Sequence, residues 1–109
     1  MAHKAVEAAG GKQAQDIVLL DVRGICSFSD YFVMCNAESS RQIKAIYDEI
    51  MHSLKNDGVL PNHREGSLDS GWLLLDYGDV IVHIFAAIER DYYQMDELWS
   101  QASPVVRIQ

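Results

Sequence analysis

The residues of this chain best suited to chemistry are four aspartates that stand at the ends of short apolar runs. Asp21 and Asp30 close one run and open the next, and Asp76 and Asp79 stand on either side of a Tyr-Gly step. Carboxylates at strand ends can hold a divalent cation. Aspartate is more often found there because its side chain bonds nearby backbone amides in a turn. We therefore predict no metal site.

His83 is the one candidate for a general base, because it lies inside an apolar run where a carboxylate opposite it would make it basic. A histidine at such a position is more often a buried member of a sheet. Ser27 and Ser29 do not stand in a G-x-S-x-G turn, and Cys26 and Cys35 are too far apart for a redox C-x-x-C.

The sequence also contains no glycine-rich phosphate loop and no Gly-Lys-Ser/Thr motif. We therefore predict no catalytic residues, no cofactor and no enzymatic activity. The alternative that stays open is a nucleotide- or metal-dependent enzyme whose site residues would be Asp21, Asp30, Asp76 and His83.

Length and composition indicate one globular domain. The chain has 109 residues, of which 49% are hydrophobic and 23% charged, and no apolar run approaches the roughly 20 residues of a membrane helix. We predict a single domain over 1–109, with its core at about 16–99 and a C-terminal tail at 100–109. The first sixteen residues lack the apolar core of a secretory signal, so we expect a cytoplasmic protein.

The formal net charge of -7 bears on the choice of partner. Nucleic-acid affinity depends on attraction between phosphates and basic side chains, whereas a chain with this negative charge is repelled by phosphates. We expect a basic protein as partner, no direct contact with nucleic acid and no membrane. Apolar strands and a free sheet edge leave homodimer formation open.

The stretch from Gly71 to Phe85 organises the predicted fold. Two apolar runs, 72–75 and 80–85, are separated by Asp-Tyr-Gly-Asp, which is typical of a β-hairpin. Neither run alternates cleanly between polar and apolar residues, so both strands should be covered on both faces. Trp72 opens this hairpin and Tyr77 stands at its tip. We expect Trp72 in the core or capping it, and Tyr77 exposed as an interface residue.

The remaining patterns predict the elements around this hairpin. Strands are expected at 16–22 and 30–36, paired antiparallel because seven residues cannot hold a crossover helix. A capping box, Ser39-x-x-Gln42, opens a helix that continues to Asp57. Shorter signals predict a helix near the N-terminus, an edge strand within 59–70 and a helix over Ile88 to Trp99. The fold class is thus α/β, a mixed five-stranded sheet packed by helices.

The chain resembles the ribosomal silencing factor family, also called Iojap-like. The resemblance covers nearly all of the chain from Asp16 to Trp99. It rests on DIVLLDVRGICSFSDYFV, the Ser-Ser-Arg-Gln opening of the long helix, Glu65-Gly66, GWLLLDYGDVIVHIF, and the ending Arg90-x-x-Tyr93-x-x-x-x-Leu98-Trp99.

This resemblance implies a nucleotidyltransferase-like fold without enzymatic activity. It also implies binding to the large ribosomal subunit through ribosomal protein L-fourteen, which blocks association with the small subunit and represses translation under nutrient limitation. A role in large-subunit assembly is the alternative. The family's interaction surface corresponds to Trp72, Leu73, Asp76, Tyr77 and Asp79.

Overall fold

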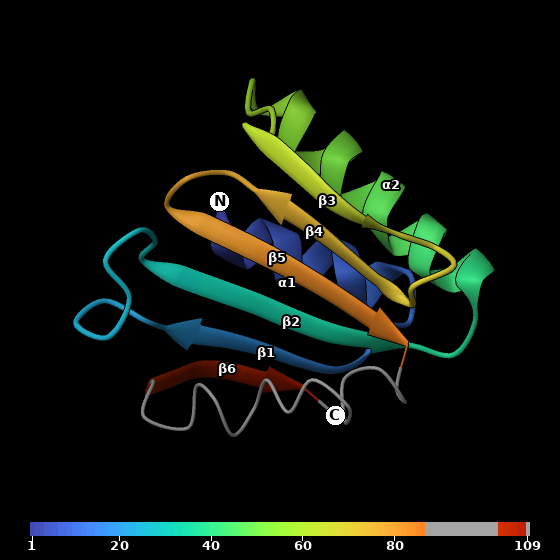
Figure 1. The fold of residues 1–109 in the computed structure, drawn as a ribbon, viewed down its shortest axis with the longest axis horizontal. Coiled ribbons are helices and arrows are strands. Elements are labelled where there is room, and N and C mark those ends of the chain that lie inside the picture. Colours follow the sequence, from blue (N-terminus) through green and yellow to red (C-terminus); the bar gives the residue numbers. More distant parts are fainter. Residues whose placement is uncertain (87–102, 109) are drawn as a thin grey trace.

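The computed structural model describes residues 1–86 and 103–108, and these residues form a layer of strands covered by a layer of helices (Figure 1). A six-stranded mixed sheet is packed on one face by two helices. The elements, in chain order, are α1 (Ala2–Gly11), β1 (Gln15–Asp21), β2 (Tyr31–Ala37), α2 (Ser40–Asn56), β3 (His63–Ser67), β4 (Trp72–Asp76), β5 (Val80–Ala86) and β6 (Ser103–Ile108).

The sheet has the strand order β3-β4-β5-β2-β1-β6. Its central pair, β2 and β5, is parallel, and the other neighbouring strands are antiparallel. The predicted antiparallel pairing of the first two strands is confirmed. Because parallel strands need a long connection, the chain leaves β2 through α2 and returns through β3 and β4 before it adds β5.

The start of α2 follows from its capping residues. The Ser39 hydroxyl accepts a hydrogen bond from the Gln42 amide at 3.1 Å, as the capping box predicts. The Gln42 side chain reaches back to the Glu38 amide instead of that of Ser39, at 2.6 Å. The side-chain nitrogen Nε2 of Gln42 also donates to the backbone carbonyls of Lys12 and Gln13. Gln42 therefore ties the end of α1 to the start of α2.

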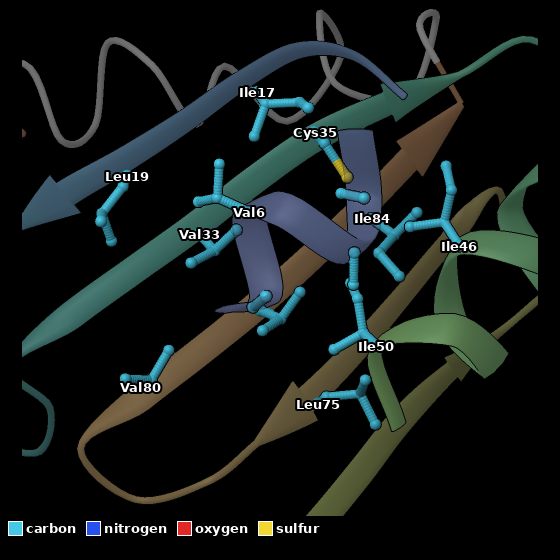
Figure 2. Close-up of a cluster of buried hydrophobic side chains, with 14 of the residues drawn as sticks. Val6, Ile17, Leu19, Val33, Cys35, Ile46, Ile50, Leu75, Val80 and Ile84 are labelled. Carbon is cyan, nitrogen blue, oxygen red and sulfur yellow. The ribbon is translucent and has the colours of Figure 1, made fainter. Parts of the chain in front are cut away.

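The main core lies between the sheet and the two helices. Figure 2 shows Val6 of α1 and Ile46 and Ile50 of α2 directed at Val33 of β2 and Ile84 of β5, all of which are buried. A smaller buried cluster occupies the opposite face of the sheet and consists of Val18, Leu20, Val22, Phe32, Met34 and Ile81. β2 and β5 are therefore buried on both faces, which for β5 confirms the prediction from its apolar run. The same prediction for β4 is wrong, because only Leu75 of its five residues is fully buried and the two helices cover only the face opposite the one that carries Trp72.

The expected count of five strands is wrong, because residues 103–108 of the predicted tail form β6. This strand pairs antiparallel with β1, with Ile17 opposite Ile108. Pro104 lacks a backbone amide, and a proline is tolerated at the edge of a sheet, where one side of the strand needs no donor. The helix predicted over Ile88 to Trp99 lies outside the described residues, and the nucleotidyltransferase-like assignment stays a prediction.

Gly66 is required by the close approach of β3 to β4. Its φ is +90°, and a Cβ atom at this position would lie 2.0 Å from the carbonyl oxygen of Trp72. Gly24 has a similar φ of +96° with open space around it. A substitution at Gly24 therefore introduces only a strained φ, whereas one at Gly66 introduces both a strained φ and a steric clash.

We predict that Gly66→Ala lowers the free energy of unfolding by about 3 kcal/mol, since strain and clash act together. Gly24→Ala should lower it by only about 1 kcal/mol, from strain alone. Urea denaturation of both variants measures the difference. Equal losses would show that β3 moves away from β4 without penalty.

Candidate binding surface

The hairpin of β4 and β5 closes through the tight turn that its sequence predicts. Gly78 has a φ of +85°, and its amide donates to the Asp76 carboxylate at 2.8 Å. The Tyr77 amide donates to the carbonyl of Val80 at 2.9 Å. Asp76 is half-buried, and its carboxylate stabilises the turn between β4 and β5.

Alternation along β4 divides the expected contact residues between two faces. Leu73 and Leu75 belong to the core beneath the helices. Leu74 packs on the smaller cluster of the opposite face, and Trp72 and Asp76 share its side of the strand because side chains alternate. The five predicted contact residues thus do not form one continuous surface.

Trp72 is half-buried. Its position is therefore between the core that its place in the hairpin predicts and the exposed surface that the family resemblance implies. Its indole Nε1 donates to Nδ1 of His83 at 3.3 Å. Its ring stacks on Phe85, with centroids 6.3 Å apart and an interplanar angle of 16°. The indole therefore packs on the sheet, and the residue as a whole stays partly exposed.

His83 is a buried sheet residue, as expected for most histidines in apolar runs. It is 5% exposed, and its ring lies 5.1 Å from that of Phe32. Met34 and Leu74 stand opposite it in the neighbouring strands, so no carboxylate pairs with it there. Burial lowers the pKa of His83 to about 4. The imidazole is consequently neutral near pH 7.

The expectation that Tyr77 is exposed is wrong. Its side chain is 7% exposed and belongs to the main core cluster. Among the described residues its hydroxyl has no hydrogen-bond partner. Burial, with a smaller contribution from Tyr47, raises the pKa of Tyr77 to about 12. The turn directs this ring toward the helices, which its place at the tip of the hairpin does not reveal.

Asp79 joins the hairpin turn to the connection between β1 and β2. Its carbonyl accepts hydrogen bonds from the amides of Asp30 at 2.9 Å and Tyr31 at 3.0 Å. The buried hydroxyl of Ser29 donates to the same oxygen at 2.9 Å. Sequence analysis missed this link because a backbone acceptor leaves no residue signature. The Asp79 carboxylate itself is exposed.

The four residues considered for an enzymatic site do not all come together. Asp21 and Asp30 line one pocket with Asp79 beneath the N-terminus of α1. Asp76 is held in the hairpin turn, and His83 lies on the helix-free face of the sheet. Within the described residues, no group of three or more His, Cys, Asp or Glu side chains is arranged to hold a metal ion.

These features define, over the described residues, a small α/β domain with two helices on one face of a mixed sheet. No helix in residues 1–86 is long and apolar enough to cross a membrane. The model of the family "Ribosomal silencing factor during starvation" matches residues 1–109, and the chain belongs to this family.

Similar proteins carry the same name or a related one. Ribosomal silencing factor RsfS of Bacillus subtilis is 40% identical over 98 residues, which cover 90% of this chain and 83% of the relative. Protein Iojap, chloroplastic, of Zea mays is 33% identical over 102 residues, covering 91% of this chain and 43% of the relative. A crystal structure of a Chromobacterium violaceum protein has a TM-score of 0.86 at 33% identity and covers 95% of this chain and 88% of its own.

We predict that Tyr77→Phe raises the free energy of unfolding by about 1 kcal/mol, because it removes a buried hydroxyl that lacks a partner. Tyr47→Phe is the matched control, since Tyr47 is only partly buried and should change stability little. Urea denaturation of both variants decides. A destabilised Tyr77→Phe protein would mean that the hydroxyl has a partner.

His83 should make folding depend on pH. Its pKa is about 4 in the folded chain against an ordinary value of 6.5, so the unfolded chain binds a proton between these pH values that the folded chain excludes. Its contribution is complete above pH 6.5 and falls by about 3 kcal/mol as the pH drops to 4. His83→Asn keeps an acceptor for Trp72 and should flatten the profile measured by denaturation at each pH. His52→Asn, at an exposed site of α2, should not flatten it.

Proposed function

We propose that this protein is a cytoplasmic ribosomal silencing factor that acts by binding and has no catalytic step. It attaches to the large ribosomal subunit through ribosomal protein L-fourteen and blocks association with the small subunit. Translation falls as a result when nutrients are limiting. Membership of the ribosomal silencing factor family supports this proposal, as do the names of relatives that match over most of their length.

The observation that carries the proposal is the partly exposed Trp72 on the helix-free face of β4. Leu74, also half-buried, lies two residues along on the same side of the strand. In the neighbouring strand, Ser67 pairs with Trp72 and Glu65 pairs with Leu74. An aromatic residue with an apolar neighbour and a polar rim is the usual composition of an interface centre.

The five residues implied by the family resemblance take different roles in this proposal. Trp72, Asp76 and Asp79 keep accessible atoms and contact the partner directly. Leu73 and Tyr77 support the hairpin from the core side, because both pack against the main cluster. A Tyr77→Ala change would open a cavity in the core, so it cannot serve as a clean test of contact.

Charge supports a basic partner surface. The net charge of -7 favours approach to a positively charged protein. The exposed Glu65 lies opposite the middle of β4, and the exposed Asp79 lies in the hairpin turn. Binding should therefore weaken as salt concentration rises.

We predict that Trp72→Ala weakens binding to isolated large ribosomal subunits about thirtyfold, which corresponds to about 2 kcal/mol for one desolvated aromatic residue. It should also restore joining of the two subunits, followed by light scattering. Leu60→Ala removes an exposed apolar side chain outside the hairpin and is the matched control. Circular dichroism confirms folding. Unchanged affinity in a folded Trp72→Ala protein would contradict the assigned surface.

A further inference from the structure

A pocket of about 530 Å³ lies where β1 ends and where β2 and β5 begin, beneath the first residues of α1. Leu19, Val80 and Val105 give it apolar walls, and the half-buried ring of Tyr31 contributes an aromatic one. It lies at the turn end of the hairpin, since Asp79 and Val80 line it, whereas Trp72 is the first residue of β4 and lies at the other end of that strand. The pocket is thus separate from the indole proposed to contact the ribosome.

Carboxylates outnumber cations around this pocket. Asp21 and Arg23 neutralise each other through a two-pronged contact, with nitrogen to oxygen distances of 3.0 and 2.7 Å. Among the described residues neither Asp30 nor Asp79 forms a salt bridge. The α-amino group of Met1, which lines the pocket, and the N-terminus of α1 together contribute about one and a half positive charges, which is less than these two carboxylates carry together. The pocket is therefore negative overall.

The combination of apolar walls and carboxylates fits a long basic side chain. The aliphatic part of a lysine or arginine packs on apolar surface while its charged end bonds to carboxylates. Arg23 already makes both kinds of contact within the protein. Its guanidinium bonds to the Asp21 carboxylate and lies 5.3 Å from the centre of the Tyr31 ring. A metal ion fits less well, since the described residues offer no set of ligands for one.

Exposed apolar residues lie on the same connection that supplies Asp30. Phe28 is 66% exposed and Ile25 is 43% exposed, both in the segment between β1 and β2. The Asp79 carbonyl fastens this segment to the hairpin turn through Ser29, Asp30 and Tyr31. A surface held in place before binding loses less entropy when a partner docks on it.

We propose that this pocket receives a lysine or arginine side chain of the protein partner and that Phe28 packs against the residues next to it. The inference rests on the proposed function, because the partner is the same large-subunit protein. It adds a second contact region, formed by the β1–β2 connection, to the one at Trp72.

Binding of variants to isolated large subunits tests the sign of the charge. Asp30→Asn should weaken binding about fivefold at low salt and less at high salt, as loss of one charged contact does. Arg23→Gln should leave binding at least as tight, because it frees the Asp21 carboxylate. Phe28→Ser should weaken binding at all salt concentrations. Asp48→Asn, on the exposed side of α2, makes the same change in net charge and should have no effect.

Weaker binding by Arg23→Gln together with tighter binding by Asp30→Asn would overturn the proposal and indicate an anion site. If Trp72→Ala weakens binding while Asp30→Asn and Phe28→Ser do not, the pocket proposal falls and the proposed function stands. If the wild-type protein does not bind large subunits at all, the proposed function falls.

Titration with N-acetyl-arginine amide, followed by amide NMR spectra, then tests the pocket alone. Shifts at Asp30, Tyr31 and Val80 in the millimolar range that disappear in Asp30→Asn support a site for basic side chains. Absence of those shifts in the wild-type protein overturns it.

Discussion

The parallel pairing of β2 with β5 is the constraint on which the rest of the structure depends. Seven residue pairs join these strands, from Tyr31 opposite Val80 to Ala37 opposite Ala86, and nearly all of their side chains are buried. A parallel pair must be covered on both faces and needs a long connection. The position of α2 on the sheet and the addition of β4 at the outer side of β5 follow from this requirement.

The same pairing brings together two connections that are far apart in the chain. Because β2 and β5 are parallel, both begin at the same end of the sheet, and the connection before β2 lies beside the turn before β5. The Asp79 carbonyl joins the two connections through three hydrogen bonds. Acidic side chains that are remote in sequence, Asp21, Asp30 and Asp79, consequently line one pocket. Backbone hydrogen bonds thus position Asp30 and Asp79, whereas Asp21 is also held by the Arg23 side chain.

The helix-free face of the sheet shows how an accessible aromatic residue is held in place. Trp72 is stacked on Phe85 and bonded to His83, and burial keeps His83 neutral so that its Nδ1 can accept the indole proton. A partly exposed aromatic residue is thereby fixed by two side chains that are themselves buried. Such support restricts the rotation of the ring within the free protein, so any contact that it makes would cost less side-chain entropy.

Sequence alone determined what depends on local chemistry: the capped helix beginning at Ser40, the hairpin around Gly78, the buried strands and the acidic charge. Tertiary structure decided which face each residue of the hairpin presents. It placed Tyr77 in the core, divided Leu73 from Trp72, and made residues 103–108 an edge strand beside β1. These outcomes depend on the order of strands and on which face the helices cover, and contacts between residues far apart in the chain set both.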